Sequence, residues 1–569
     1  MDSAVKRESG RGKGGRKAFL PKGRQLDEAA LAEVRALLGD QAVRRDLLIE
    51  YLHLIQDRHG HLSARHLRAL AEMMRLSQAE IYEVASFYDH FDIVREGEAP
   101  PPPLTIRICD SLSCMLAGAE ALLAKVEVGV DPARVRVARA PCMGGCDVAP
   151  AGRVGNREVG HADADTLLAL AAGAARNADL GPRIPDHVGL DAYRRAGGYD
   201  ALARIRAGAV QFGAFVQMLA EAGLKGLGGA GFPAGTKWKI VRGFPGPRLM
   251  TINGDEGEPG TFKDRYYLEH DPHRLLEGAL IAAHFIEAER IYLYMRDEYP
   301  AVLEILRREI TALERSGLIV PGFIELRRGA GAYICGEESA MIESIEGKRG
   351  LPRHRPPYIA ERGLFGRPTL NHNVETLWWV RDIFEKGPQW FADQGRPGHP
   401  GIRSWSVSGR VRQPGVKLAP AGITARELIE DHCGGMAEGH VFKAYLPGGA
   451  SGGILPASMA DIPLDFGGEL AAVDAFVGSH AVVVLSDRDS VREAVVNLLS
   501  FFAHESCGQC TPCRGGTEKL VALLRRDGPL DEPAIRDIEA VMRDASICGL
   551  GQAAPNPVNH WLRYFGEER

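Results

Sequence analysis

The sequence has no apolar run of the length that a membrane span requires. A spanning helix needs about 18 or more consecutive apolar residues, and no uninterrupted apolar segment of the 569 residues approaches that length. This argues against an integral membrane protein. The excess of one sign of charge is also small, because 69 Lys and Arg residues face 74 Asp and Glu residues and leave a net charge of −5. A dedicated nucleic-acid-binding protein, which needs a strong positive charge, is therefore not expected.

A secretion signal is missing as well. The first 25 residues carry eight Lys and Arg residues against two Asp and Glu residues. No apolar stretch follows these basic positions, as a signal peptide would require. We therefore expect a cytoplasmic protein in a reducing compartment. Residues 1–26 are predicted to form a basic arm, either a disordered tail or an arm that lies on an acidic partner surface.

Glycine, by contrast, is abundant. It accounts for 67 of the 569 residues, which is about 12% against an average of about 7%. This indicates backbone that approaches a ligand closely, or many tight turns. At about 150 residues per domain, the length predicts roughly four globular domains.

Eight of the ten cysteines fall into two compact groups of four. In a reducing compartment such groups are typical of metal or cluster ligands rather than of disulfides. The sequence therefore predicts two inorganic cofactors. The two remaining cysteines, Cys335 and Cys433, are assigned to packing.

The first group has the spacing C-x4-C, 27 intervening residues, then C-x3-C. Its pairs follow two predicted strands, so four thiolates can converge where these strands end. Zinc remains an alternative, but zinc ligands are usually paired as C-x2-C. Four thiolates without a histidine fit a 2Fe–2S cluster, which we favour. The members of the group are Cys109, Cys114, Cys142 and Cys146.

The second group has three cysteines at C-x2-C-x2-C and a distant fourth. Three thiolates on one tight loop match three iron atoms of a 4Fe–4S cluster, and the remote cysteine binds the last. Zinc sites more often divide their ligands two and two. His504 precedes the loop and is expected to be structural. The members are Cys507, Cys510, Cys513 and Cys548.

The periodicity and composition of the sequence change along the chain. Residues 27 to about 95 have helical periodicity, and a proline-rich boundary at 100–103 leads into a small α/β region. Between about 190 and 400, strands alternate with helices, which favours an α/β sheet with ligands at the strand ends. Residues from about 402 to 475 indicate a β-rich module, and those after about 488 are helical. The predicted strands are 104–108, 135–140, 248–253, 290–296, 323–328, 404–411, 442–446 and 481–485.

One glycine-rich segment, 223–238, contains a formal GxGxxG at Gly226, Gly228 and Gly231. A dinucleotide fingerprint needs a strand before it, whereas a helix is predicted there. The glycines still indicate a backbone cradle for a phosphate or a ring, with Lys237 as a nearby cation.

A second segment, 323–345, runs from a strand through a glycine loop into a helix, whose start suits a phosphate. The carboxylates of Glu337 and Glu338 would repel a phosphate, so hydroxyl groups of a ribityl or ribose, or a cationic ring, fit better. A third segment, 253–265, follows a strand and places three acidic residues where a strand-end ligand would lie. These are Asp255, Glu256 and Glu258.

Seven segments carry a family resemblance: GLGGAGFPAGTKW, NGDEGEPGTFKDR, GAGAYICGEES, GLFGRPT, NHNVETL, ESCGQCTPC and SICGLGQAA. They resemble the flavin-bearing, NADH-oxidising subunit of respiratory complex I. The first 180 residues resemble the smaller partner of that subunit, and the two are joined here in one chain. The fused arrangement is most similar to the beta (diaphorase) subunits of NAD-dependent formate dehydrogenases that contain molybdenum or tungsten.

The resemblance covers essentially everything after residue 25 and implies a multidomain α/β fold. The implied units are an N-terminal helical segment (27–100), a thioredoxin-like 2Fe–2S ferredoxin domain (101–180), a Rossmann-like FMN/NADH-binding domain (181–401), a ubiquitin-like β-grasp module (402–480) and a C-terminal helical bundle with a 4Fe–4S cluster (481–569).

The resemblance also implies residue roles. FMN would contact Gly226, Gly228, Lys237, Asn253, Asp255, Tyr333, Gly336, Glu337 and Asn373. NADH would stack on the flavin with help from Phe232, Glu258, Glu338 and Tyr358, of which Glu258 and Glu338 are the candidate catalytic residues. The two cysteine groups would hold the 2Fe–2S and 4Fe–4S clusters. Three positions depart from the family pattern: His372 replaces an asparagine, Arg355 replaces a lysine before the prolines, and Tyr358 replaces a phenylalanine after them.

These roles predict a diaphorase that transfers a hydride between NAD(H) and FMN and passes single electrons through the clusters. The expected partner is a catalytic alpha subunit with a molybdenum or tungsten pterin and further iron–sulfur clusters. The diaphorase subunit of an NAD-reducing hydrogenase and a fused NADH-quinone oxidoreductase component are alternatives with the same chemistry. A non-enzymatic iron–sulfur scaffold is the alternative from a different class.

Overall fold

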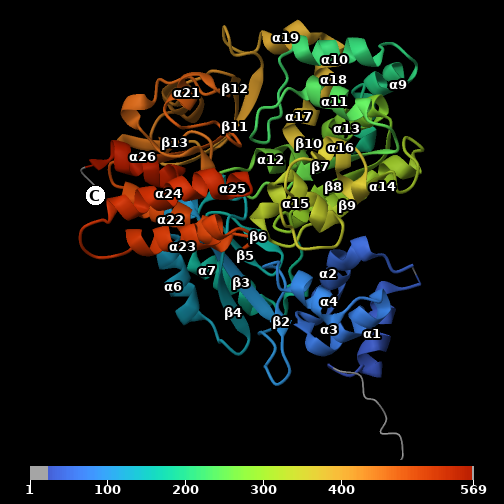
Figure 1. The fold of residues 1–569 in the computed structure, drawn as a ribbon. Coiled ribbons are helices and arrows are strands. Elements are labelled where there is room, and N and C mark those ends of the chain that lie inside the picture. The colour runs from blue at the N-terminus through green and yellow to red at the C-terminus, as the bar shows by residue number, and fades with distance from the viewer. Residues whose placement is uncertain (1–22, 41, 567–569) are drawn as a thin grey trace, which may run out of the picture.

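The computed structural model describes residues 23–40 and 42–566. The predicted basic arm lies outside these residues except for positions 23–26. Five units follow one another along the chain (Figure 1). We call them the N-terminal helical unit, the small α/β unit, the large α/β unit, the β-rich unit and the C-terminal helical unit. None of the helices in the described ranges combines the length and the apolar composition needed to cross a bilayer.

The N-terminal helical unit packs four helices around shared apolar faces. Leu48, Leu52 and Ile55 recur at helical spacing and are fully buried, as an amphipathic helix requires. The last helix begins at a capping box between Ser77 and Glu80, which satisfies two free N–H groups at its start. The elements are α1 (Glu28–Leu38), α2 (Leu48–His59), α3 (Ala64–Met74), α4 (Gln78–Ala85), β1 (Leu62–Ser63) and β2 (Ile93–Val94).

The small α/β unit contains a mixed sheet of order β4-β3-β5-β6. Because β3 and β4 are parallel, their carboxyl ends meet at one edge of the sheet. This places Cys109, the last residue of β3, beside the loop that carries Cys142. The elements are β3 (Leu104–Cys109), α5 (Leu112–Leu116), α6 (Ala119–Gly129), β4 (Val135–Ala140), β5 (Gly152–Val154), β6 (Arg157–Val159) and α7 (Ala164–Gly173).

The large α/β unit is built on a parallel sheet of order β10-β7-β8-β9. Alternate side chains of β8 enter two different cores. Ile291 and Leu293 pack among the helices of this unit, whereas Tyr292 and Tyr294 pack in a core shared with the N-terminal helical unit. That unit therefore helps to cover one face of the sheet, and a hydrogen bond of 2.9 Å from Tyr88 to Ser344 crosses the contact.

The strands of the large α/β unit are β7 (Arg248–Gly254), β8 (Ala288–Met295), β9 (Ile324–Arg328) and β10 (Thr369–Asn373). Its helices are α8 (Leu190–Arg195), α9 (Asp200–Arg206), α10 (Phe212–Glu221), α11 (Ala234–Gly243), α12 (Lys263–His270), α13 (Pro272–Ile286), α14 (Pro300–Arg315), α15 (Glu338–Ile345), α16 (Ile359–Arg362), α17 (Val374–Trp378), α18 (Val380–Lys386) and α19 (Pro388–Ala392).

The β-rich unit has a five-stranded sheet of order β12-β11-β15-β13-β14. Its central pair, β11 and β15, is parallel, and the other pairs are antiparallel. The boundary expected at residue 480 is wrong, because it would cut off β15, the middle strand. Strand pairing is nonlocal and is not visible in the sequence; the β-grasp assignment stays a prediction. The elements are β11 (Ile402–Gly409), β12 (Gly415–Pro420), α20 (Ala425–Glu427), β13 (Phe442–Leu446), β14 (Leu455–Pro456), α21 (Gly468–Ala472) and β15 (Ala481–Ser486).

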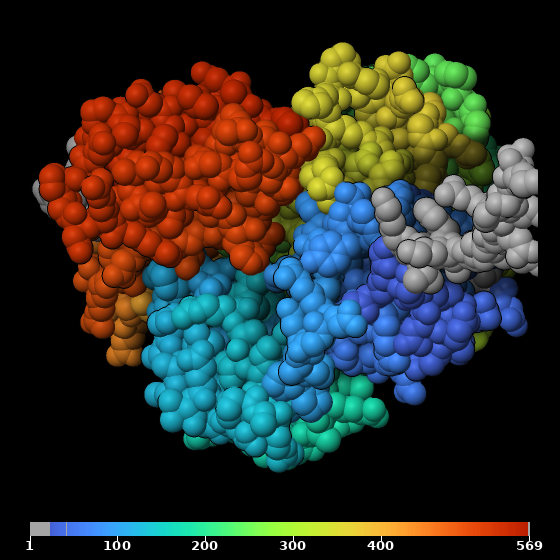
Figure 2. All heavy atoms as spheres, turned by 60° about the horizontal axis from the view of Figure 1, so that its bottom comes forward, coloured from blue at the N-terminus to red at the C-terminus, as the bar shows by residue number. Residues whose placement is uncertain are grey.

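The C-terminal helical unit lies between the β-rich unit and the small α/β unit in Figure 1, and Figure 2 shows its surface adjoining that of the small α/β unit. Asn497 donates a hydrogen bond of 2.8 Å to the backbone oxygen of Asp110 in the small α/β unit, and the side chain of Asn556 donates one of 2.9 Å to the backbone oxygen of Ser451 in the β-rich unit. The elements are α22 (Val491–His504), α23 (Thr511–Leu524), α24 (Glu532–Ala545), α25 (Gly549–Ala553) and α26 (Asn556–Tyr564).

The close approach of α13 and α17 supplies a test of this packing. A Cβ added at Gly278 would overlap the backbone oxygen of Leu377, whereas one added at Gly213, on an exposed helix face, would meet nothing within 4 Å. We expect Gly278→Ala to destabilise the unit by about 1–3 kcal/mol, and to lower the calorimetric Tm by several degrees. Gly213→Ala is the matched control and should leave Tm unchanged or slightly higher. Equal Tm values for the two variants would contradict the packing described here.

Candidate functional site

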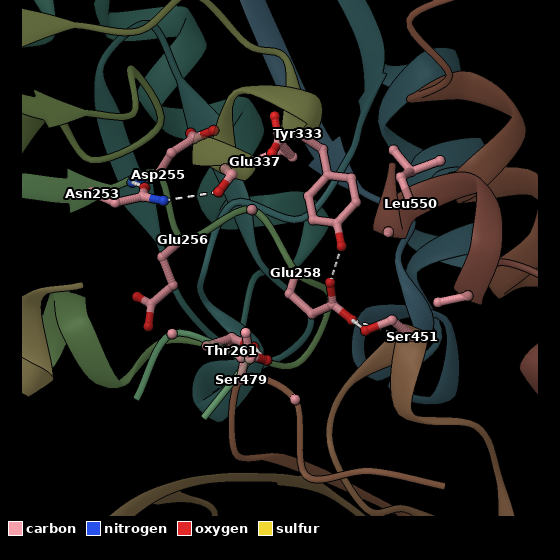
Figure 3. A pocket seen from close by; sticks show the side chains of 18 of the residues that line it. Asn253, Asp255, Glu256, Glu258, Thr261, Tyr333, Glu337, Ser451, Ser479 and Leu550 are labelled. Carbon is pink, nitrogen blue, oxygen red and sulfur yellow. Dashed lines mark hydrogen bonds between the residues drawn. The ribbon is translucent and has the colours of Figure 1, made fainter. Parts of the chain in front are cut away.

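A cavity of about 550 Å³ lies where the large α/β unit meets the β-rich and C-terminal helical units (Figure 3). Asn253 in β7 and Asn373 at the end of β10 form one side of it. Ser451 and Ser479 come from the β-rich unit, and Leu550 comes from α25. Parallel α/β sheets bind ligands at the carboxyl ends of their strands, and the cavity lies at that edge.

The structure brings together eight of the thirteen residues predicted to bind FMN or NADH. These eight line the cavity although they come from segments as far apart as residues 228 and 373. Their individual contacts with a cofactor stay a prediction. The eight are Gly228, Asn253, Asp255, Glu258, Tyr333, Gly336, Glu337 and Asn373.

The other five, Gly226, Phe232, Lys237, Glu338 and Tyr358, do not line the cavity. Phe232 and Tyr358 are 46% and 59% exposed. The ammonium of Lys237 lies 3.2 Å from a carboxylate oxygen of Glu338. The glycine loop and the start of α15 extend from the cavity to the surface, so these five residues lie outside the cavity, and their roles in binding FMN or NADH stay predictions.

Arg355 connects these outer residues with the cavity. Its guanidinium lies 3.2 Å from Glu338, and it also donates a hydrogen bond to Glu337, which lines the cavity. Burial raises the pKa of Glu338, but the charges of Lys237 and Arg355 outweigh this and lower it. Glu338 is therefore ionised, and the outer surface carries a charged cluster beside two exposed aromatic rings.

The backbone of the glycine loop lines part of the cavity without intervening side chains. A Cβ at Gly228 would lie 2.8 Å from the Cβ of Asn373, so no larger residue fits there without displacing that asparagine. Gly229 has φ +139 and also lines the cavity, a conformation that strongly favours glycine. The cradle expected at the first glycine segment is thus formed at Gly228 and Gly229.

Asp255 offers an unused hydrogen-bonding atom to the cavity. Its Oδ2 atom is buried and has no hydrogen-bond partner within the described part of the chain. Burial raises the pKa of Asp255 well above its usual range. A buried polar atom without a partner is costly, and a hydroxyl group of a ligand would remove that cost. The residues at this position therefore fit the ribityl chain of FMN.

Glu256 belongs to the same acidic segment, but its carboxylate forms its hydrogen bonds within the protein. Its two carboxylate oxygens accept hydrogen bonds of 2.8 and 3.1 Å from the backbone N–H groups of Asp264 and Arg265. Tyr299 donates another of 3.1 Å. Burial and the neighbouring Asp264 raise the pKa of Glu256 to about 8. Its role is to hold the start of α12 against the cavity.

Glu258 joins two walls of the cavity (Figure 3). One oxygen accepts a hydrogen bond from the hydroxyl of Tyr333. The other accepts bonds of 2.8 and 2.7 Å from the backbone and hydroxyl of Ser451 in the β-rich unit. Burial raises the pKa of Glu258.

Glu337 occupies the start of α15. Its Oε2 atom accepts hydrogen bonds of 2.9 Å from the backbone N–H groups of both Ser339 and Ala340, as an N-cap side chain does. The helix start is therefore already capped by a carboxylate. That no phosphate binds directly at this helix stays a prediction, which the capping carboxylate supports.

His372, the departure from the family pattern, lies behind the cavity rather than in it. It is 3% exposed, and its Nε2 atom accepts a hydrogen bond of 2.7 Å from the indole N–H of Trp238. Burial and the charge of Lys237 lower the pKa of His372 well below its usual range, so the ring is neutral. The histidine positions Trp238 and does not line the cavity.

Sequence reasoning missed several residues of the cavity. Lys263 is 1% exposed and its ammonium lies 2.8 Å from Asp264 and 3.1 Å from Glu375; the only signal was its place in the segment 253–265. Ser451 lies in the segment PGGASGG, whose glycines indicate a turn but no ligand. Three further cavity residues of the β-rich unit and one of the C-terminal helical unit had no local signal: Phe476, Gly478, Ser479 and Asn556. The segment SICGLGQAA indicated a cluster ligand at Cys548 but not that the residues after it line the cavity, which are Gly549, Leu550, Gln552 and Ala553.

The first cysteine group converges as predicted. The Sγ atoms of Cys142 and Cys146 are 3.4 Å apart, and Cys109 is in hydrogen-bonding contact with Cys114 and Cys142. All four are at most 3% exposed. The backbone N–H of Gly144 points at the sulfur of Cys142, with a distance of 3.4 Å, which is the glycine approach expected beside a cluster.

The second cysteine group gathers at the starts of two helices. Cys510 precedes α23, Cys513 lies in its first turn, and Cys548 precedes α25. Three of the four are only half-buried, and Cys513 is buried. His504 is bonded to Glu505 rather than to the cysteines, and this hydrogen bond raises its pKa to about 9. It is structural, as expected.

Both cysteine groups lie next to the cavity. Gly549 and Leu550, directly after Cys548, line it. On the side of the small α/β unit, Phe262 packs against Cys142 and Cys146, and it adjoins the cavity residues at 261 and 263. The two cysteine groups therefore adjoin the cavity through neighbouring residues, one from the small α/β unit and one from the C-terminal helical unit.

Three known domains match the chain. Residues 219–382 match the Nuo51 FMN-binding domain, residues 34–174 the thioredoxin-like [2Fe-2S] ferredoxin, and residues 493–569 the NADH-ubiquinone oxidoreductase-F iron-sulfur binding region. These matches confirm the predicted cofactors: FMN, NAD(H), one 2Fe–2S cluster and one 4Fe–4S cluster. The zinc alternative is set aside for both cysteine groups.

Solved structures resemble nearly the whole chain. An NAD⁺-reducing [NiFe]-hydrogenase in its H2-reduced state is similar with a TM-score of 0.81 and 33% identity, over 93% of this chain and 92% of that chain. The air-oxidised state gives a TM-score of 0.79 over 92% of both chains. The fused arrangement of this chain therefore has a counterpart among known structures.

Curated relatives match about two thirds of the chain. One of them, an NADH-quinone oxidoreductase protein of Rhizobium meliloti, is 40% identical over 407 residues, which are 69% of this chain and 95% of that protein. Its counterpart in Aquifex aeolicus is 40% identical over 392 residues, 67% of this chain and 90% of that protein. With the cavity between two cysteine groups and a relative matched over nearly its full length, the chain belongs to the NADH-quinone oxidoreductase-F family, with a thioredoxin-like 2Fe–2S domain fused to it.

Proposed function

We propose that this chain is the beta (diaphorase) subunit of an NAD-dependent formate dehydrogenase, which exchanges electrons with a catalytic subunit that carries a molybdenum or tungsten pterin. The NADH-oxidising diaphorase chemistry is common to its family. The assignment to formate oxidation rests on the likeness of the fused sequence to such beta subunits. The observation that supports the electron-transfer role is the cavity at the strand ends, which lies next to both cysteine groups.

FMN, when bound, takes up a hydride and releases electrons one at a time. The residues of this chain provide the setting for that chemistry. Gly228 and Gly229 let backbone face the ligand, Asp255 offers a hydrogen-bonding oxygen, and Glu258 holds the opposing wall in place through Ser451.

The outer cluster is the place where the nicotinamide nucleotide would enter. Phe232 and Tyr358 are exposed rings that can stack on flat groups, and Lys237 and Arg355 supply positive charge beside Glu338. Because Arg355 also contacts Glu337 of the cavity, a nucleotide bound here would reach from the surface toward the strand ends.

The exposure of the second cysteine group supports an electron exit on the C-terminal helical unit. Cys507, Cys510 and Cys548 are half-buried, whereas the first group is enclosed. A partner subunit can therefore approach the 4Fe–4S side more closely than the 2Fe–2S side.

A diaphorase subunit of an NAD-reducing hydrogenase is the second candidate. It is supported by the likeness, at 33% identity, to such an enzyme over more than nine-tenths of both chains. The two candidates share the diaphorase chemistry and differ in the catalytic partner and in its metal.

Purification of the tagged chain from its own cells under anaerobic conditions distinguishes them. Under our proposal the complex contains molybdenum or tungsten and reduces NAD⁺ with formate. Nickel in the complex and NAD⁺ reduction with H2 would instead identify the hydrogenase. A complex without any catalytic metal, in which NADH reduces a quinone, would point to a fused NADH-quinone oxidoreductase component.

The glycine loop provides a test of the FMN site. Gly228→Ala places a Cβ 2.8 Å from Asn373, whereas Gly226→Ala places one no closer than 3.5 Å to any neighbour. Overpacking of about 1–3 kcal/mol should weaken FMN binding by about tenfold or more in Gly228→Ala, because about 1.4 kcal/mol corresponds to a factor of ten. The measurement is the FMN-to-protein ratio and the FMN Kd of the reconstituted chain. Gly226→Ala is the control and should retain FMN. Loss of FMN in both variants would show that the FMN site extends along the loop to residue 226.

The exposed ring of Tyr358 provides a test of the nucleotide site. Tyr358→Ala removes a stacking surface worth about 0.5–1.5 kcal/mol, so we expect the KM for NADH to rise about 2- to 12-fold with an artificial acceptor. FMN content should not change, because Tyr358 lies outside the cavity. Tyr358→Phe keeps the ring and should behave like the unsubstituted chain. A KM that is unchanged in Tyr358→Ala would remove this residue from the nucleotide site.

A further inference from the structure

Two histidines and an aspartate gather where the N-terminal helical unit contacts the large α/β unit. His53 and Asp57 are four residues apart on α2, so they share one face of the helix, and His90 follows α4. One ligand atom from each of the three lies within 4.8 Å of the others. The rings of His53 and His90 are 4.7 Å apart, centroid to centroid.

In each histidine, one ring nitrogen has a hydrogen-bonding partner and the other has none within the described residues. The Nε2 atom of His53 lies 2.9 Å from the backbone oxygen of Gly329. The Nδ1 atom of His90 lies 2.8 Å from a carboxylate oxygen of Asp297. Carbonyl and carboxylate oxygens only accept hydrogen bonds. These two nitrogens therefore carry protons, and in the neutral rings the other two present lone pairs.

The free nitrogens are buried. His53 is 3% exposed, and neither its Nδ1 atom nor the Nε2 atom of His90 has a hydrogen-bond partner in the ranges 23–40 and 42–566. Leaving two buried lone pairs without partners costs free energy. The packing of the fold has not removed this cost, which indicates a ligand between the rings.

A metal ion is the ligand that fits this chemistry. Metal-bound histidines donate their second N–H to a backbone carbonyl or a carboxylate, which fixes the ring and its tautomer; here Gly329 and Asp297 occupy those places. Two imidazoles and a carboxylate are ligands typical of zinc and related divalent metals. We propose that His53, Asp57 and His90 bind one divalent transition-metal ion of the zinc type, with solvent in the remaining position.

The surrounding charges permit such an ion. Arg328 lies 2.7 Å from Asp57 and 2.6 Å from Asp297, so two carboxylates offset one guanidinium before the ion binds. The side chain of Asp57 is 51% exposed, which gives the ion a route from solvent. The ligands come from the N-terminal helical unit and their orienting partners from the large α/β unit, so the ion would fasten the contact between the two.

A neighbouring trio serves as an internal comparison. Glu33, His59 and His66 also bring ligand atoms within 4.8 Å. Both nitrogens of His66 are already used, however, by Ser63 at 3.0 Å and by Glu33 at 2.7 Å. His59 alone among the three offers a free nitrogen within the described ranges, so this trio lacks the paired lone pairs of the proposed site.

The test measures zinc binding to the full chain loaded with FMN and both clusters under anaerobic conditions. After incubation with ZnCl2 and gel filtration, elemental analysis should find one zinc per chain with unchanged iron, and X-ray absorption at the zinc edge should show nitrogen and oxygen ligands including imidazole. His53→Gln and His90→Gln should each weaken zinc binding by about 100-fold or more, and Asp297→Asn by about 10- to 100-fold. His66→Gln, which removes the comparison trio, should retain the zinc.

Three results would overturn the proposal. The first is that the unsubstituted chain binds no zinc. The second is that the His53→Gln/His90→Gln double variant retains zinc. The third is a zinc-edge spectrum with sulfur ligands only, which would assign the ion to the cysteine groups. This spectrum is recorded on the unsubstituted chain, so the test holds even where a variant fails to fold.

Discussion

The carboxylate of Glu258 is the contact on which the closure of the cavity depends. It binds the hydroxyl of Tyr333 on one side and Ser451 on the other, and so links two loops of the large α/β unit with the β-rich unit. The backbone N–H of Tyr333 continues the chain by donating a 2.9 Å bond to Glu505, at the end of α22. Three units are thereby held around one volume by a series of polar contacts rather than by a single apolar core.

Several carboxylates line the cavity, and they differ in their hydrogen-bonding partners. Glu256 holds α12 and Glu337 caps α15, so these carboxylates are used within the protein. Lys263 offsets Asp264 and Glu375 in a buried network; breaking such a network by removal of one charge is far more costly than its net contribution to stability. Asp255 keeps an oxygen without a partner among residues 23–40 and 42–566.

The two cysteine groups differ in the way they are enclosed. The first lies at the carboxyl ends of β3 and β4 and is sealed by Phe262 of the large α/β unit. The second lies at two helix starts and keeps three half-buried cysteines. Burial and hydrogen bonds to sulfur are the means by which a protein sets cluster potentials. The fold therefore gives the two cysteine groups different environments although each contains four cysteines.

Features that depend on neighbouring residues could be predicted from the amino-acid order alone. Cysteine spacing predicted both quartets, and apolar alternation predicted strands such as 104–108 and 248–253, which the structure contains as β3 and β7. The glycines at 228 and 229 were visible as a cradle for the same reason.

Other features emerged only from the packing of distant segments. Ser451 and Ser479 close the cavity, β15 is the middle strand of the β-rich sheet, and Lys237 and Glu338 lie outside the cavity. Such arrangements depend on contacts like the one between Glu258 and Ser451, which are 193 residues apart. Periodicity and spacing report on the side chains of one local segment, whereas these contacts are set by how whole units pack against one another.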